Sequence, residues 1–181
     1  MKLFRALLLT ALLILPFAGC AAIPYTDEAR AQALLDGLAQ FYQTDVLIKT
    51  GGMEARAHIY RPDPMRTRVE IRYPERLAGF VYSFGEGGVE LQLQSLSFHL
   101  DSFAGVSTVP IPRGVSALSS LLIPQAERAL PARQNGLWAL RGEFDGEVCI
   151  LFLDAQNGLP VKLLLQSSEV EFVFENFVFL G

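Results

Sequence analysis

The chain has 181 residues, of which 15 are Lys or Arg and 19 are Asp or Glu, so its formal net charge is −4. This length predicts a single domain that can bury a hydrophobic core and needs no disulfide bond or bound metal for stability. The acidic balance argues against a nucleic-acid-binding protein, which would normally show a basic patch, and the chain offers no polybasic segment for anionic lipid headgroups.

The first twenty residues have the order of a secretory signal peptide. Lys2 and Arg5 precede an apolar run, which is followed by small residues and Cys20. The apolar stretch over residues 6–19 has 14 residues, fewer than the about 20 that a spanning helix needs. We expect residues 1–19 to be removed, which leaves 13 basic and 19 acidic residues and a net charge of −6. The alternative is an ordinary signal peptide or short anchor in which Cys20 has no special role.

Residues 17–20, Phe-Ala-Gly-Cys, resemble the bacterial lipobox, although Phe17 stands where that pattern usually has Leu, Val or Ala. In the lipobox the signal is cut before the cysteine, and that cysteine is lipidated. The resemblance implies palmitate or another acyl group on Cys20, a tether over residues 20–25, and an extracytoplasmic protein anchored to a bacterial membrane. Ala21 lacks the Asp of the inner-membrane retention signal. The outer membrane is therefore implied for a cell with two membranes, and the outer face of the cell membrane otherwise.

One amphipathic helix is predicted over residues 26–43. Thr26 is a suitable N-cap, and acidic residues follow it in the first turn, where they suit the helix dipole. Leu34, Leu38 and Phe41 then recur at helical spacing and form one apolar stripe.

From residue 45 onward, apolar and polar residues alternate, which predicts antiparallel strands with one dry and one wet face. Gly51-Gly52, Asp145-Gly146 and Asn157-Gly158 are turn signals between them. The expected strands cover residues 45–49, 53–60, 67–73, 80–84, 89–93, 96–100, 137–144, 147–154, 161–166 and 169–180.

The alternation of apolar and polar residues is interrupted between the two groups of strands. Pro110 and Pro112 are expected to open a loop, and residues 115–123 to form one short helix that ends at Pro124. The prediction is an α+β fold, in which about ten strands form one strongly curved antiparallel sheet with a few helices against one face.

No catalytic or metal-binding set emerges from the sequence. His58 and His99 lack Cys, His, Asp or Glu at the spacing of a known metal signature. Residues 105–107 and 114–116 both have the sequence Gly-Val-Ser, which is how a nucleophile elbow begins. Neither has the second glycine that this motif needs two residues after Ser107 or Ser116. Cys149 lies in an apolar run and is interpreted as a small buried hydrophobe. We therefore expect no enzyme activity, cofactor or metal; a hydrolase acting on envelope material would need a reactive Ser107 or Ser116.

Three short motifs occur in order along the chain. Arg61-Pro62 follows the second expected strand, residues 154–162 form a late hairpin with the pattern Asp-x-x-x-Gly-x-Pro, and residues 169–179 form an apolar closing strand. Together with the N-terminal helix, this order resembles the LolA/LolB-like superfamily of periplasmic lipoprotein carriers and outer-membrane lipoprotein receptors. The resemblance implies a single domain over residues 26–181, built as an unclosed half-barrel with helices on its concave face.

The same resemblance implies a membrane-anchored envelope lipoprotein that binds acyl chains, lipid or lipoprotein in an apolar hollow. Burial there would stabilise each methylene by about 0.8 kcal/mol. Arg61 would contact a helical lid, and the tether favours a receptor, acceptor or sensor over a diffusing carrier. The surplus of Phe and the alternating pattern suggest that the hollow is lined by Phe80, Tyr82, Phe84, Leu91 and Leu93. The alternatives are a surface position for Arg61, ordinary core packing of these five residues, and a non-catalytic structural or protein-interaction module with no ligand.

Overall fold

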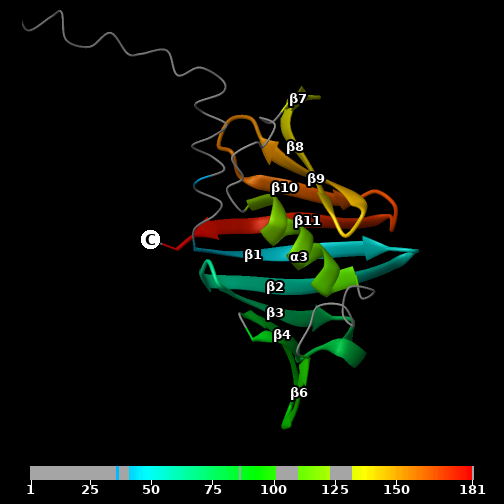
Figure 1. The fold of residues 1–181 in the computed structure, drawn as a ribbon. Helices are drawn as coiled ribbons and strands as arrows, with labels where there is room; N and C mark the ends of the chain where they lie inside the picture. The colour runs from blue at the N-terminus through cyan, green and yellow to red at the C-terminus, as the bar shows by residue number, and fades with distance from the viewer. Residues whose placement is uncertain (1–35, 37–40, 86, 101–109, 123–131, 181) are drawn as a thin grey trace, which may run out of the picture.

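The computed structural model describes residues 36, 41–85, 87–100, 110–122 and 132–180 (Figure 1). The expected signal peptide and tether, with Cys20, lie outside the described residues, as does most of the helix expected over residues 26–43. Within that segment Asp36 is helical, but Tyr42 and Gln43 already belong to a strand. The predicted end of the helix at Gln43 is therefore wrong.

Eleven antiparallel strands form one sheet in the described part of the chain, in the order β6-β5-β4-β3-β2-β1-β11-β10-β9-β8-β7. The central strands are β1 and β11, and the edge strands β6 and β7 do not pair with each other, so the sheet is not a closed barrel. The strands are β1 (Tyr42–Thr50), β2 (Met53–Asp63), β3 (Arg66–Tyr73), β4 (Phe80–Gly85), β5 (Gly88–Leu93), β6 (Leu96–Leu100), β7 (Ala132–Gln134), β8 (Leu137–Phe144), β9 (Glu147–Asp154), β10 (Pro160–Leu165) and β11 (Val170–Phe179).

Two meanders share this sheet. Successive antiparallel pairings carry the chain from β1 outward to β6, and the second half returns from β7 to β11, which pairs with β1. Gly51 and Gly52 connect β1 to β2 with φ values of 51° and 80°. Positive φ at both positions is what a tight two-residue hairpin requires, and glycine adopts it without steric cost.

The helix α3 (Pro110–Leu122) lies across one face of the sheet (Figure 1). It contacts β8, β9, β10 and β11. We call the sheet face that it covers the inner face; Val46, Ile48 and Phe172, all at most 2% exposed, belong to it. The buried side chains of α3 complete this core, and they are Ile111, Pro112, Val115, Ala117, Leu118, Leu121 and Leu122.

The helix between the two groups of strands differs from the prediction in its start. Of the few helices expected on the concave face, the described residues place α3 against the sheet, and they also contain one short 3₁₀ helix, η2 (Glu75–Leu77). Pro110 and Pro112 lie in the first turn of α3 and do not open a loop. Proline fits there because the first N–H groups of a helix have no intrahelical acceptor.

Two glycines allow α3 to lie close to the sheet. A Cβ atom on Gly114 of α3 would lie 2.0 Å from ring atoms of Phe172 in β11. A Cβ atom on Gly142 of β8 would lie 2.4 Å from Leu121 Cδ2 of α3. Both distances are far below van der Waals contact, so these positions tolerate no larger residue without movement of a neighbouring side chain.

An ion pair holds the first half of α3 to β9. Arg113 Nε lies 2.8 Å from Glu147 Oε2, and Glu147 is 2% exposed. The N–H and the hydroxyl of Ser168 donate hydrogen bonds to Glu147 Oε1 at 2.6 and 2.8 Å. Burial opposes ionisation of Glu147, but the bonds from Ser168 and the charge of Arg113 outweigh it and hold the pKa of this carboxyl below its usual 4.5.

Replacing Gly114 with Ala should destabilise the protein by at least about 1 kcal/mol. Overpacking a core costs about 1–3 kcal/mol and here outweighs the helix propensity that Ala gains over Gly. The free energy of unfolding, measured by urea denaturation, reports the effect. Gly85→Ala is the matched control, because a Cβ atom there meets nothing within 4 Å. Equal stability of the two variants would contradict the close approach of α3 to Phe172.

Replacing Glu147 with Gln should lower the free energy of unfolding at neutral pH by about 1–3 kcal/mol, because a charged hydrogen-bond acceptor is lost. Since the folded-state pKa lies below the unfolded value of about 4.5, this stabilisation is present above pH 4.5 and is lost as pH falls through the folded-state pKa. Urea denaturation at several pH values should therefore show the wild type and E147Q converging in acid. The exposed Glu143→Gln serves as control, and a difference for E147Q that does not depend on pH would refute this role.

Candidate functional site

The five residues predicted to line a hollow lie together on the inner face of β4 and β5. Directly opposite residues of paired strands share a face, and Phe80 pairs with Leu93 and Tyr82 with Leu91. Tyr82 also pairs with Val69 of β3, which is fully buried in the core. The structure thus brings the predicted residues to the same side of the sheet as α3.

Burial decreases from the centre of the sheet toward the β6 edge. Phe84 is 8% exposed and packs in the core, whereas the other four predicted residues are half-buried. On β6, Leu96 and Phe98 pair with Leu93 and Leu91 and are 58% and 55% exposed. The inner face of β4 to β6 is therefore an apolar surface that becomes accessible away from α3.

An apolar cavity of about 180 Å³ opens where this surface meets the start of α3. The hairpin of β1 and β2 forms one wall, η2 and the residue before it a second, and Tyr82 and the first residues of α3 the remainder. Only two lining residues carry a charge, Glu54 and Arg76. The full lining is Ile48, Thr50, Met53, Glu54, Ala55, Pro74, Arg76, Leu77, Tyr82, Pro110 and Ile111.

Tyr82 connects this cavity to the apolar surface beside it. Its ring stacks with that of Phe84 at a centroid distance of 6.4 Å, which joins the cavity wall to the core. Burial raises the pKa of the Tyr82 hydroxyl, so the side chain stays neutral at physiological pH. Apart from Glu54 and Arg76, the cavity therefore presents neutral groups, most of them aromatic or aliphatic, to any occupant.

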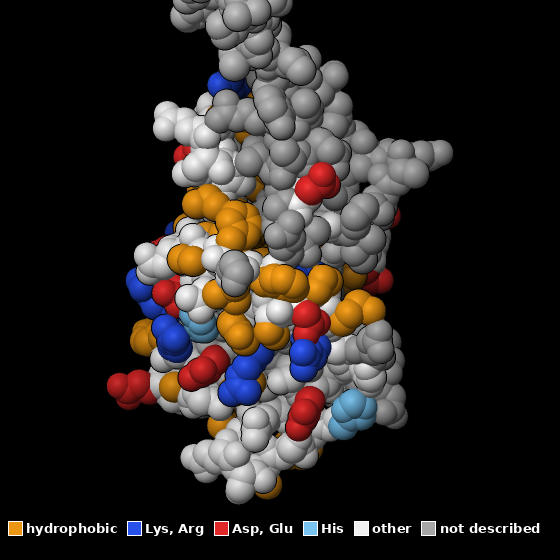
Figure 2. Space-filling view, turned by 90° about the vertical axis from the view of Figure 1, so that its left-hand side faces the viewer, with side chains coloured by type: hydrophobic (Ala, Val, Ile, Leu, Met, Phe, Trp, Pro, Cys, Tyr) orange, Lys and Arg blue, Asp and Glu red, His pale blue; other side chains and the backbone are white. Residues whose placement is uncertain are grey.

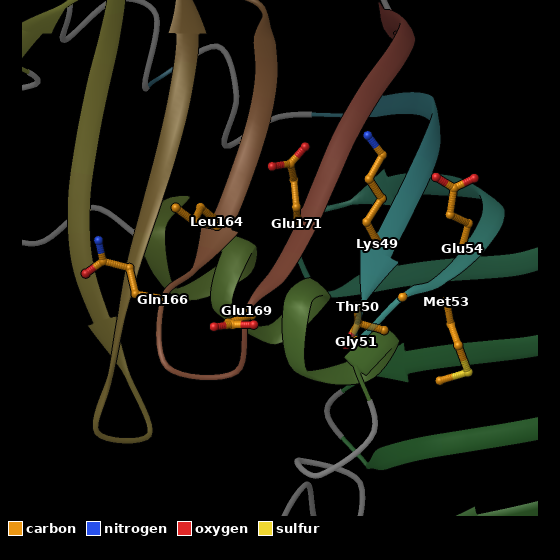
Figure 3. Close-up of a pocket in the computed structure, with 10 residues that line it drawn as sticks. Lys49, Thr50, Gly51, Met53, Glu54, Leu164, Gln166, Glu169 and Glu171 are labelled. Atoms are coloured by element: carbon orange, nitrogen blue, oxygen red, sulfur yellow. The ribbon is translucent and has the colours of Figure 1, made fainter.

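A larger hollow of about 600 Å³ lies at the same end of the sheet, on the outer face (Figure 3). Its lining is largely polar: Lys49 and Glu171 extend side by side from β1 and β11, and Glu54 extends from β2 (Figure 3). Glu171 also forms an ion pair with Lys162, with 3.5 Å between Oε2 and Nζ. Charged side chains favour water over hydrocarbon, so the inner-face cavity is the better candidate for an apolar ligand.

Arg61 of β2 is 5% exposed and lies beneath α3 rather than at the surface. Its Nη1 donates a hydrogen bond to Ser119 Oγ of α3 at 3.3 Å, and its Nη2 donates one to the Pro64 carbonyl at 2.7 Å. Burial, only partly offset by Arg61, raises the pKa of the neighbouring Tyr42 to about 12, so this phenol stays neutral beside the guanidinium. Arg61 thus ties β2 to the second half of α3.

The outer face carries a polar network around Asp45. His58 Nδ1 donates to Asp45 Oδ1 at 2.9 Å, and Arg72 and Asn176 donate to the same carboxylate at 3.2 Å each. The hydrogen bond from His58 is the main cause that holds the pKa of Asp45 below its usual range. These bonds join β1, β2, β3 and β11, so the network stabilises the centre of the sheet.

Across the described ranges, no three His, Cys, Asp or Glu side chains are arranged to hold a metal ion. In the same ranges, no helix has the length and hydropathy needed to cross a membrane. Ser116 lies inside α3 rather than at the strand-to-helix turn of a nucleophile elbow, and Ser107 lies outside the described residues.

Of the residues predicted to bind a ligand, Tyr82 alone lines the cavity, so the sequence did not predict most of its lining. Alternation places Ile48 and Ala55 on the inner face, but no local pattern shows that Ile111 lies above them. Arg113 and Glu147 were also missed, because their pairing depends on how α3 is placed over β9. The one available signal was the register of Glu147, which precedes Cys149 and Leu151 at period two and so shares their face of the strand.

The sequence is similar to no protein-family model and to no curated protein. Solved structures do share the fold. An uncharacterized conserved protein from Thermus thermophilus superposes with a TM-score of 0.51 at 18% identity, covering 84% of this chain and 88% of that protein. A LolA superfamily protein from Nitrosomonas europaea gives a TM-score of 0.50 at 12% identity, covering 83% of this chain and 94% of the other. The open antiparallel sheet with α3 across it therefore has the LolA/LolB-like fold.

Proposed function

We propose that this protein is an extracytoplasmic lipoprotein, anchored to a bacterial membrane through Cys20, that holds acyl chains of a lipid or lipoprotein between α3 and the sheet. The observation that carries the proposal is the apolar cavity beside Tyr82, which continues into the half-buried inner face of β4 and β5. The proposed role is one of binding, without catalysis, cofactor, metal or nucleic acid.

The size of the cavity sets what it would hold. Its volume of about 180 Å³ is below the about 300–1,000 Å³ of common small-molecule pockets. We therefore place the end of an acyl chain in the cavity, and the remainder along Tyr82, Leu91 and Leu93 toward the exposed Phe98. Each methylene removed from water would contribute about 0.8 kcal/mol.

Arg61 is the proposed lid contact, and α3 is the proposed lid. Burial of Arg61 and its hydrogen bond to Ser119 support this role. Because α3 also forms one wall of the cavity through Pro110 and Ile111, a change in how α3 lies on the sheet would change the space open to a ligand.

Replacing Tyr82 with Glu should weaken binding of a fluorescent fatty acid at least about tenfold, because a carboxylate in an apolar site is poorly solvated. Fluorescence titration measures the affinity, and circular dichroism checks that the variant is folded. Tyr60→Glu is the matched control, because Tyr60 lies on the outer face and is 39% exposed. Met53→Glu tests the mouth of the same cavity at a side chain that is 60% exposed, where folding is not at stake. Unchanged uptake by both Y82E and M53E would remove the cavity assignment.

The proposed anchor predicts that acylation depends on Cys20 alone. Cys149 is fully buried, and burial raises the pKa of its thiol to about 11, so it offers no nucleophilic thiolate. Metabolic labelling with an alkyne analogue of palmitate should mark the wild type and Cys149→Ala, and should fail for Cys20→Ser. Intact-mass analysis should show cleavage before residue 20. Labelling that persists in C20S would contradict the anchor.

The edge strand β6 favours a second candidate function, a non-catalytic interaction module. Leu96 and Phe98 are more than half exposed, and in the described sheet β6 pairs with β5 alone. Exposed apolar edges are common sites for partner strands. Absence of acyl-chain uptake by the wild type would favour this function over the cavity.

A further inference from the structure

The start of β1 and the end of β11 lie at the same end of the sheet. The N–H of Leu180 donates to the Phe41 carbonyl at 2.9 Å, so the two chain segments meet there. Figure 2 looks onto this end, and hydrophobic side chains gather in a band across the middle of the view. We call Phe41 together with residues 177–180 (Phe-Val-Phe-Leu) the aromatic rim.

The rim is apolar on both faces of the sheet. Phe179 pairs with Tyr42 on the inner face, and Val178 pairs with Gln43 on the outer face. Phe41, Val178 and Phe179 are 39%, 48% and 42% exposed. Strands that border water normally alternate apolar and polar residues. A run of four consecutive apolar residues in which Val178 and Phe179 are exposed therefore indicates a surface that contacts something other than water.

Aromatic packing holds the rim in place. Tyr42, 1% exposed, stacks on Phe177 with 4.8 Å between ring centroids. Phe177 then meets Phe179 edge-on at 5.4 Å and Phe174 at 6.4 Å. The exposed Phe179 thus belongs to a rigid cluster rooted in the core, so presenting it to an apolar phase requires little ordering of the side chain.

The position of the segment between Cys20 and Phe41 indicates what the aromatic rim contacts. Residue 20 precedes Phe41 by 21 positions, a span of up to about 70 Å when extended. An acyl anchor at Cys20 would therefore keep the domain near a membrane without fixing its orientation. The rim lies at the end of the sheet where this segment joins β1, and none of its five residues carries a charge. This composition suits the acyl boundary of a neutral lipid surface, where Phe and Leu side chains insert.

We propose that the aromatic rim is a second membrane contact, which inserts into the lipid surface and orients the domain with β1 and β11 end-on. The inference rests on the proposed anchoring through Cys20 and adds the orientation that an anchor alone does not supply. Weak contacts become effective when an anchor already holds the domain at the surface. Because the rim is uncharged, the contact is insensitive to salt.

The test places a fluorophore at the rim of the full, anchored chain. Val178→Cys is labelled with an environment-sensitive dye, while Cys20 is blocked by its lipid and Cys149 is buried. Proteoliposomes are made from phosphatidylcholine with or without bromine on the acyl chains. Bromine should quench the label at position 178 by roughly half, as expected for insertion to a depth of about 5–10 Å. A label at Glu143→Cys, an exposed position at the opposite end of the sheet, should keep its intensity.

The possible outcomes separate the two proposals. A chain that floats with the vesicles but shows no bromine quenching at position 178 overturns the rim contact and leaves the anchor intact. A chain that does not float overturns the anchor and this inference with it. A label at position 178 that is equally shielded without vesicles shows a protein occupant, either the chain's own N-terminal segment or a second copy, and also overturns it. Phe179→Glu should abolish the quenching at position 178 while flotation persists.

Discussion

The close seating of α3 on the inner face is the constraint on which the rest of the structure depends. Gly114 lies against Phe172, the Arg113–Glu147 ion pair fixes the first half of the helix, and Arg61 reaches the second half through Ser119. Glu147 and Arg61 are buried and Arg113 is partly buried, and each of these charged groups has a polar partner, as burial of charge requires. The helix that completes the core also closes one side of the cavity, so the stability of the core and the space in the cavity depend on the same contacts.

This arrangement accounts for two kinds of apolar surface in one sheet. Beneath α3 the inner face is filled by side chains such as Leu163 and Phe172. Beyond the helix, from Tyr82 to Phe98, the same alternating pattern continues without equal cover. Among the described residues, α3 has thirteen residues and is too short to cover the full width of an eleven-stranded sheet. The apolar width that α3 leaves uncovered supports the proposed binding role.

The sequence predicted the strands well because alternation is a local property. The limits of β8 and β9, and the turns at Gly51-Gly52 and Asp145-Gly146, follow from period two and turn chemistry alone. β7 was missed because three exposed residues, Ala132–Gln134, carry no periodic signal. The start of α3 was missed because Pro110 and Pro112 favour a loop as well as a first helical turn. The predicted ligand residues share one face, but the cavity itself depends on α3, whose position over Ile48 and Ala55 no local pattern specifies.

The measurement that tests the central claim most directly is native mass spectrometry of the protein extracted from its membrane and freed of detergent in the gas phase. The account predicts a species heavier than the mature acylated chain by the mass of one acyl lipid, and loss of that excess in the folded Tyr82→Glu variant. A wild-type spectrum that contains only the acylated chain, before and after incubation with phospholipid, would contradict acyl-chain binding by this fold.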